Sequence, residues 1–141
     1  MKVKEFMTSP VEGVRSDGTI AQAAKLMQTS DIGVLPVMDN DQVVGVLTDR
    51  DIAVRVVAEG LDPQSTPVRK AMTEQVVCCS EDDDFREAAS VMEDSKVHRL
   101  LVLSEDKKVT GILAIADIVR NIRDAGLVQE VLGKICEPSR V

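Results

Sequence analysis

Aromatic residues are almost absent from this chain of 141 residues, which has two Phe and no Tyr or Trp. Proteins that bind single-stranded nucleic acids stack bases on aromatic side chains, and this chain lacks the residues for such a platform. Its formal net charge of −7 also repels the phosphate backbone of nucleic acids. We therefore expect no nucleic-acid partner, and any base that the protein binds must lie between aliphatic side chains.

Long apolar runs are missing as well. No stretch approaches the eighteen or more apolar residues that a membrane span needs. The opening residues Met1–Glu5 are not followed by the apolar segment of a secretory signal. We therefore expect no contact with a membrane and a cytoplasmic protein.

Cysteine and histidine are scarce, with three Cys and one His. The adjacent Cys78 and Cys79, together with Cys136, form neither a CxxC redox motif nor a set of zinc ligands. An odd number of cysteines fits a reducing compartment, so we expect free thiols. The acidic run Glu81–Asp84 precedes a predicted helix and complements its dipole without a metal. GxSxG, HExxH and P-loop motifs are absent, so we expect no enzymatic activity, no metal and no cofactor.

Branched aliphatic residues dominate what is present, with 22 Val and 8 Ile. Such residues favour strands, whereas other segments have apolar residues at helical spacing. The length suffices for a sizeable hydrophobic core without disulfides. These features together predict a mixed α/β (α+β) fold.

The chain contains an internal duplication. Met7-Thr8 recurs as Met72-Thr73, and ten of the 32 positions from residue 7 to 38 are identical 65 residues later. After a one-residue insertion the correspondence resumes, with Asp51-Ile52 matching Asp117-Ile118. Each copy has only about 50 residues, so we expect the two to pack as one globular unit. The predicted segments are a first copy over 7–60, a linker over 61–71, a second copy over 72–125 and a C-terminal amphipathic segment over 126–141.

Each copy predicts the order β-α-β-β-α. In the first copy Ile20, Ala23, Ala24 and Met27 lie on one face of a helix. Apolar runs on both sides of the turn residues Asp39–Asp41 predict a hairpin. The expected elements lie at 11–15, 20–30, 34–38, 43–47 and 49–59, then at 76–79, 85–95, 97–103, 109–113 and from 115 on, with Gly126 separating an amphipathic segment over 127–136.

Three motifs in this order carry a resemblance to a known family. They are the opening Met-Thr, the strand Ile32–Val37 and the strand-to-helix turn Gly45–Ile52, each with a counterpart in the second copy. The duplicated unit resembles a tandem pair of CBS domains, or Bateman module, and its layout is similar to stand-alone bacterial CBS-domain proteins. The resemblance implies a regulatory dimer that binds AMP, ADP, ATP or S-adenosylmethionine in a cleft between the repeats.

The turn at the end of the second hairpin strand is the strongest candidate site. A helix begins there, so backbone N–H groups and the positive end of a helix dipole lie at the turn. The resemblance implies that Thr48 contacts phosphate or ribose and that Asp51 accepts from ribose hydroxyls, which suits an acceptor-only carboxylate. The alternative is that Thr48 and Asp51 form a capping box and bind no ligand.

The second copy has a reduced version of this turn. Ala114 and Ala116 stand where the first copy has Thr48 and Arg50, which leaves Asp117 as a candidate ribose contact. The loss of the hydroxyl and the guanidinium weakens the second site. We therefore expect the turn of the first copy to be the better nucleotide site.

Two basic residues precede the hairpin of the second copy. The resemblance implies that His98 and Arg99 reach ligand phosphates, and an Arg fork suits such an anion. Strand alternation, however, directs only one of the pair toward the cleft. The matching Gly33 and Val34 of the first copy are uncharged, so Arg50 would have to supply the cation there.

The strand of the first copy supplies aliphatic candidates. The resemblance implies that Ile32, Gly33 and Pro36 flank an adenine, although the same residues also suit an ordinary core. Two functions remain open. One is a nucleotide sensor whose change of conformation or dimer state is read by an unidentified protein partner, and the other is a scaffold homodimer with vestigial pockets.

Overall fold

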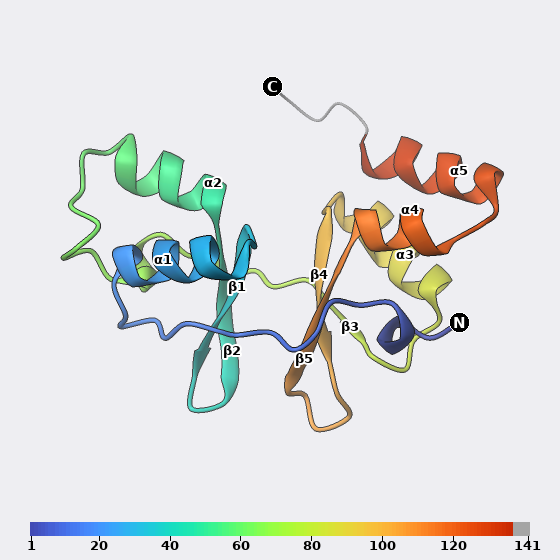
Figure 1. The fold of residues 1–141 in the computed structure, drawn as a ribbon, viewed down its shortest axis with the longest axis horizontal. Coiled ribbons are helices and arrows are strands. Elements are labelled where there is room, and N and C mark those ends of the chain that lie inside the picture. The colour runs from blue at the N-terminus through green and yellow to red at the C-terminus, as the bar shows by residue number, and fades with distance from the viewer. Residues whose placement is uncertain (137–141) are drawn as a thin grey trace. The chain divides into compact units, whose positions relative to one another are not determined.

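The computed structural model describes residues 1–136 (Figure 1). The chain forms two compact units. One unit contains residues 12–76, and the other combines residues 1–11 with residues 77–136. Helices and strands are mixed in both units, so the predicted α/β (α+β) fold class is confirmed.

The unit of residues 12–76 begins with helix α1 (Ile20–Ser30). Thr19 caps this helix, because its hydroxyl accepts from the Gln22 N–H at 3.2 Å while the Gln22 side chain accepts from the Thr19 N–H at 3.0 Å. The helix ends at Asp31, which adopts a left-handed conformation. Ala24 is exposed although the apolar spacing predicts it on the buried face.

A hairpin and a second helix complete this unit. Strands β1 (Val34–Asp39) and β2 (Gln42–Thr48) pair antiparallel, and both residues of the turn between them have positive φ, as a two-residue hairpin requires. Helix α2 (Asp49–Ile52) follows β2 directly and continues as a π-helical turn over Ala53–Val57. The segment at 11–15, predicted as a strand, forms a single bridge between Val14 and Val37. One bridge does not make a strand, so this prediction is wrong.

The other unit has the same order with a strand added before it and a helix added after it. Its elements are β3 (Cys78–Ser80), α3 (Phe85–Ser95), β4 (Arg99–Leu103), β5 (Val109–Ala114), α4 (Ile115–Asn121) and α5 (Ala125–Ile135). Strand β4 is central, parallel to β3 and antiparallel to β5. Gly126 lies inside α5 rather than before it, because Asp124 caps that helix by accepting from the Leu127 N–H at 3.1 Å. The last five residues of the predicted 126–141 segment lie outside the described residues.

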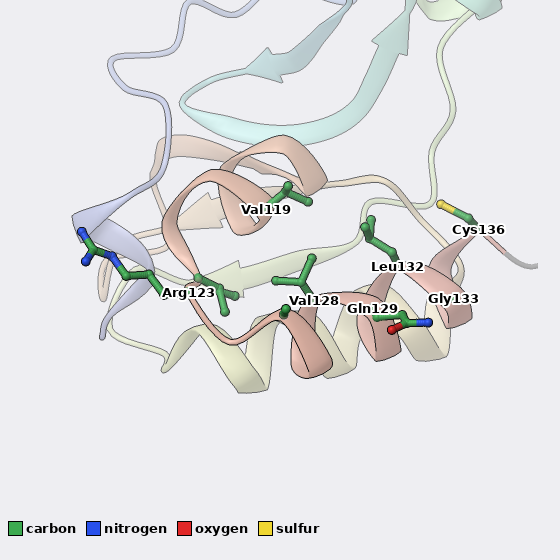
Figure 2. A pocket seen from close by; sticks show the side chains of 9 residues that line it. Val119, Arg123, Val128, Gln129, Leu132, Gly133 and Cys136 are labelled. Atoms are coloured by element: carbon green, nitrogen blue, oxygen red, sulfur yellow. The ribbon is translucent and has the colours of Figure 1, made fainter.

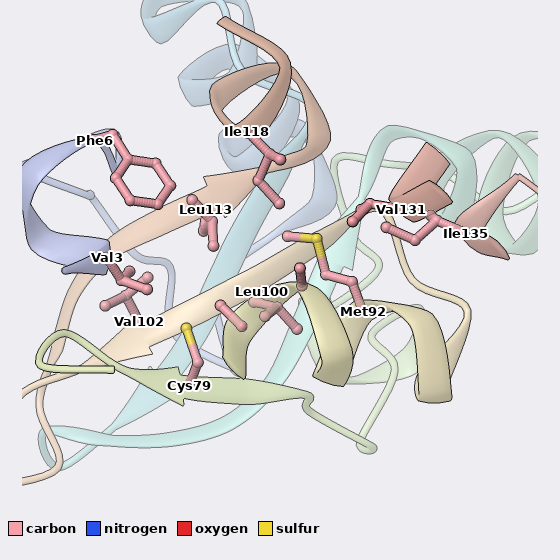
Figure 3. Packing of buried hydrophobic residues seen from close by; sticks show 12 residues of the cluster. Val3, Phe6, Cys79, Met92, Leu100, Val102, Leu113, Ile118, Val131 and Ile135 are labelled. Atoms are coloured by element: carbon pink, nitrogen blue, oxygen red, sulfur yellow. The ribbon is translucent and has the colours of Figure 1, made fainter. Parts of the chain in front are cut away.

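Each unit has its own core of aliphatic side chains. In the unit of residues 12–76, α1 packs on the hairpin through Ile20, Met27 and Leu47. Figure 3 shows the core of the other unit, where Val3 and Phe6 from the N-terminal segment lie with side chains of the sheet, α3, α4 and α5. The N-terminal segment is therefore part of a core that is otherwise built from residues after 77.

The duplicated Met-Thr segments pair with the hairpin of the opposite copy. Thr73 and Val46 exchange two backbone hydrogen bonds of 2.8 and 2.9 Å, and Thr8 and Ile112 exchange two of 2.9 and 3.0 Å. The compact units thus start after the Met-Thr segments, whereas the sequence copies start with them. The copy boundaries proposed above, 7–60 and 72–125, remain a prediction about the duplication.

Gly45 lies under the Thr73 segment, and its substitution tests this pairing. A methyl group at Gly45 would lie 2.8 Å from the Thr73 carbonyl oxygen and 3.0 Å from the Met72 sulfur. We expect Gly45→Ala to lower the free energy of unfolding by about 1–3 kcal/mol, because the Met72-Thr73 segment must move away from β2. Urea unfolding measures this change.

Gly133 provides the matched control. It lies in helix α5, and nothing is within 4 Å of a methyl group placed there. Gly133→Ala should raise the free energy of unfolding by up to about 1 kcal/mol, because Ala favours the helix. Equal stability of Gly45→Ala and the unmodified chain would contradict the close packing of this segment.

Candidate functional site

The turn from β2 into α2 is a reciprocal capping box. The Thr48 N–H donates to Asp51 Oδ2 at 2.9 Å, and the Asp51 N–H donates to Thr48 Oγ1 at 3.0 Å. The Asp51 side chain is 13% exposed. The geometry predicted by the capping alternative is therefore present, and both candidate residues lie at the turn.

Capping leaves hydrogen-bonding capacity on both side chains. The Thr48 hydroxyl accepts one hydrogen bond and retains its own proton as a donor. Within residues 1–136, Asp51 Oδ1 accepts no hydrogen bond, and the nearest cation is Arg55 Nε at 4.0 Å. The Arg55 guanidinium is held elsewhere, because its Nη1 donates to the carbonyls of Ala71 and Met72 at 3.0 Å each. The turn thus offers one donor and one acceptor.

Gly33 lies next to this turn. The Asp49 N–H donates to the Gly33 carbonyl at 3.0 Å, and a side chain at Gly33 would lie 2.8 Å from Asp49 Oδ2. A side chain at Gly33 would require the Asp49 carboxylate to move, so glycine lets this carboxylate stay beside the strand. Thr48 pairs with Val34 across the hairpin, which places Gly33, Thr48 and Asp51 in one region.

The other candidates of the first copy differ in exposure. Ile32 is half-buried against the core, and Pro36 is buried in the middle of β1 opposite Val46. Arg50 is exposed, and its guanidinium has no ion pair with any residue that the structure describes. Pro36 thus contributes to the packing of the hairpin, whereas the guanidinium of Arg50 is exposed near the turn.

In the second copy, both oxygens of the equivalent carboxylate accept hydrogen bonds within the protein. Asp117 Oδ2 accepts from the Ala114 N–H at 2.9 Å, as Asp51 does from Thr48. Asp117 Oδ1, however, accepts from Arg120 Nη2 at 3.0 Å, and the Asp117 side chain is only 7% exposed. Arg120 is not among the residues predicted for the site, although its i,i+3 spacing from Asp117 allows such a pair.

His98 and Arg99 lie beside the turn of the second copy. The Ile115 N–H donates to the His98 carbonyl at 3.1 Å, and Arg99 pairs with Ala114. Both side chains are exposed. His98 and Arg99 therefore occupy the places that Gly33 and Val34 occupy in the first copy, next to Asp117.

The acidic run Glu81–Asp84 is used in local contacts. Asp84 caps α3 by accepting from the Arg86 N–H at 3.0 Å, and Asp82 pairs with Lys4 at 3.2 Å. The hydrogen bond and charge of Lys4 hold the pKa of Asp82 below its usual value. In residues 1–136, no group of three or more His, Cys, Asp or Glu side chains is arranged to hold a metal ion.

An apolar groove of about 700 Å³ lies along α4 and α5 (Figure 2). Val119 of α4 and Val128 and Leu132 of α5 line it, and Cys136 lies at one end. None of the candidate ligand-binding residues lines this groove. It is therefore a separate feature of the unit that contains α5.

The two repeats match a known family. The family described as CBS domain matches residues 3–58 and 68–124. This chain belongs to the CBS-domain family. Hypoxic response protein 1 of Mycobacterium tuberculosis is 35% identical over 136 residues, which cover 96% of this CBS-domain chain and 94% of that protein. A solved structure of Hypoxic Response Protein I with two coordinated zinc ions has a TM-score of 0.77 at 33% identity and covers 86% of this chain and 99% of that one.

Two further solved CBS structures hold adenosine derivatives. The CBS domain pair of protein MJ0100, in complex with 5′-methylthioadenosine and S-adenosyl-L-methionine, has a TM-score of 0.75 at 27% identity and covers 85% of this chain and 94% of that one. CBSX2 in complex with AMP has a TM-score of 0.70 at 25% identity and covers 84% and 93%. The predicted CBS pair is thus confirmed.

The helices of residues 1–136 are all too short or too polar to cross a membrane.

The three cysteines of this CBS pair are free thiols in different surroundings. Cys79 is buried, Cys78 is half-buried and Cys136 is exposed. Burial, with smaller effects of Asp83 and Cys78, raises the pKa of Cys79 to about 12. The thiol of Cys79 therefore stays protonated at neutral pH and is a poor nucleophile.

Thiol labelling tests these surroundings. At pH 8 we expect iodoacetamide to label Cys136 in the native protein and to leave Cys79 unlabelled until the chain unfolds, because a pKa of about 12 leaves about one thiolate in ten thousand. Mass spectrometry of peptides measures both sites. Rapid labelling of Cys79 in the native protein, or a disulfide-bridged Cys136 peptide, would contradict this expectation.

Proposed function

We propose that this CBS pair is a regulatory sensor that binds an adenosine-containing ligand, such as AMP, ADP, ATP or S-adenosylmethionine, at the Thr48–Asp51 turn. The observation that carries the proposal is the accepting oxygen that Asp51 keeps beside the Thr48 hydroxyl. A carboxylate oxygen suits the two hydroxyls of a ribose, because it only accepts hydrogen bonds. The adenosine derivatives bound by MJ0100 and CBSX2 support this ligand class.

Neighbouring residues of the first copy fit the remaining parts of such a ligand. Ile32 is half-buried and supplies an aliphatic contact for a base, while Gly33 leaves room because it has no side chain. Arg50 is exposed and supplies a cation for phosphate. Pro36 is buried within β1, the strand that directly follows Ile32 and Gly33.

The second copy supports weaker binding. Arg120 already occupies Asp117 Oδ1, and Ala114 supplies no hydroxyl. A ligand at Asp117 must displace the guanidinium before it gains a hydrogen bond there. His98 and Arg99 are exposed beside this turn, and their side-chain N–H groups suit a phosphate rather than a ribose.

One observation favours a second function. The capping box uses both Thr48 and Asp51, so the turn is explained without any ligand. A scaffold dimer with vestigial pockets would keep this turn for the stability of α2 alone. The two functions differ in whether Asp51 affects a ligand response.

A thermal-shift panel of AMP, ADP, ATP and S-adenosylmethionine tests the sensor. A ligand at a hundred times its dissociation constant stabilises the protein by about 2.7 kcal/mol. The thermal midpoint should then rise by at least about 5 °C. Asp51→Ala should weaken binding about ten- to hundredfold, because a charged hydrogen-bond partner is lost.

Asp117→Ala is the matched control. It also removes a cap at a strand-to-helix turn, so both variants lower the midpoint of the free protein. We expect Asp117→Ala to keep the ligand-induced shift that Asp51→Ala loses. Equal ligand-induced shifts in both variants, or no shift with any ligand, would support the scaffold function instead.

We also propose that the chain forms a homodimer through exposed apolar residues of its helices. Val54 and Val119 are 48% and 41% exposed, so both are available for an apolar contact with a second chain. Light scattering should give twice the mass of one chain, and a Val54→Glu/Val119→Glu variant should give the mass of one. A single-chain mass for the unmodified protein would contradict the dimer.

A further inference from the structure

Arg120 has no charged counterpart in the first copy. The correspondence between the copies makes Asp117 equivalent to Asp51 and Arg120 equivalent to Val54. Val54 cannot donate to a carboxylate, and Asp51 Oδ1 accepts no hydrogen bond within residues 1–136. The two strand-to-helix turns thus share a carboxylate, but only that of the second copy is hydrogen-bonded to an arginine side chain.

Two hydrogen bonds hold the Arg120 guanidinium at the turn of the second copy. Its Nη2 donates to Asp117 Oδ1 at 3.0 Å, and its Nε donates to the Ala116 carbonyl at 3.2 Å. The Arg120 side chain is 71% exposed, whereas the Asp117 side chain is only 7% exposed. A nearly buried carboxylate thus shares its second oxygen with a guanidinium that lies mostly in solvent.

A change of partner at this carboxylate costs little. The guanidinium is already hydrated, so leaving Asp117 exposes few new atoms of Arg120 to water. An exposed ion pair changes an equilibrium by about two- to fivefold. The carboxylate oxygen regains hydrogen bonds when the two hydroxyls of a ribose replace the guanidinium.

A phosphate is a better partner for the released guanidinium than the carboxylate is. A phosphate monoester carries a charge of about −1.5 to −2 at pH 7, which exceeds the single charge of Asp117. Arginine also binds phosphate through two parallel N–H donors. His98 and Arg99 are exposed beside the same turn, so with Arg120 three side chains there donate to anions.

We propose that Arg120 makes the second copy selective for phosphorylated adenosine ligands, because its guanidinium leaves Asp117 for the phosphate when the ribose binds the carboxylate. The inference rests on the proposed function, since it takes Asp117 as a ribose contact equivalent to Asp51. Adenosine breaks the ion pair and offers the guanidinium no other anion. The first copy has no such pair, so adenosine binds its turn without this cost.

Titration of adenosine and AMP into the full-length ¹⁵N-labelled chain provides the test. The amide signals of Ala114 and Ala116 give the dissociation constants at the second copy, and those of Gly33 and Arg50 give the constants at the first. At the second copy AMP should bind about two- to fivefold more tightly than adenosine. Repeating the titration with Asp51→Ala, which weakens the first site, assigns the changes at Ala114 and Ala116 to ligand bound at the second copy.

Arg120→Met separates an exchange of partners from simple blocking. Methionine is unbranched and favours helix, and it has no group that donates to Asp117. Adenosine should bind the second copy about two- to fivefold more tightly in this variant, because no ion pair has to open. AMP should bind no more tightly than before, because it loses its contact with the guanidinium. The preference for AMP over adenosine should therefore fall about two- to fivefold.

Arg123→Met is the matched control. It removes the same charge three residues later, and Arg123 is exposed and has no ion pair with any residue that the structure describes. This variant should keep the preference for AMP that Arg120→Met loses.

Three results would overturn the proposal. Equal tightening of both ligands in Arg120→Met would mean that Arg120 only blocks the carboxylate, and equal weakening would mean that it only supports α4. Unchanged signals of Ala114 and Ala116 at millimolar AMP would mean that the second copy holds no nucleotide.

The same titration tests the proposed function separately. Changes at Gly33 and Arg50 that require Asp51 support the proposed site even where the second copy fails these tests. Their absence, with the preference for AMP retained at Ala114 and Ala116, would overturn the proposed site and not the role of Arg120.

Discussion

Two hydrogen bonds between side chains and backbone at the Thr48–Asp51 turn fix both the start of α2 and the polar groups beside it. Each side chain accepts from the other residue's N–H, so neither can change rotamer without exposing an unpaired donor. The remaining capacity of the hydroxyl and the carboxylate is therefore held in one orientation. A ligand that uses these groups loses little side-chain entropy on binding, because that entropy is already lost on folding.

Comparison of the two copies shows which side chains the strand-to-helix turn needs in order to fold. The second copy keeps its carboxylate on the backbone of Ala114 at 2.9 Å, although it has no hydroxyl. A carboxylate alone thus suffices to start α4. The Thr48 hydroxyl is therefore not required to start a helix at such a turn. Arg120 shows that the second carboxylate oxygen binds a cation of its own helix when one is in reach.

Local patterns predicted most of the fold. Helix α1 follows from apolar spacing and the Thr19 cap, and the hairpin follows from turn residues that tolerate positive φ. The segment at 11–15 was wrong as a strand, because a single bridge depends on tertiary contacts that composition does not encode. Gly126 was wrong as a boundary, because Asp124 supplies a stronger start signal two residues earlier.

The candidate site was predictable in part. The Thr48–Asp51 spacing indicated the capping box, since N-cap and N3 residues are three apart. Spacing places Arg55 four residues after Asp51 and Arg120 three residues after Asp117, so it allows an ion pair at both turns. It does not predict that two carbonyls hold Arg55 while Arg120 binds Asp117, because this depends on the acceptors that each guanidinium can reach. Nor did the apolar periodicity distinguish Ala24 from Ala89, since only the presence of α5 makes one of them part of a core.

The exchange of the Met-Thr segments sets an order for folding during synthesis. The unit of residues 12–76 is contiguous and is complete on the ribosome before the other sheet exists. Residues 1–11, although made before that unit, have no hairpin to pair with until Ile112 of β5 has been added. During translation Val3 and Phe6 therefore lack the partners of their core until the strands and helices after residue 77 have been made.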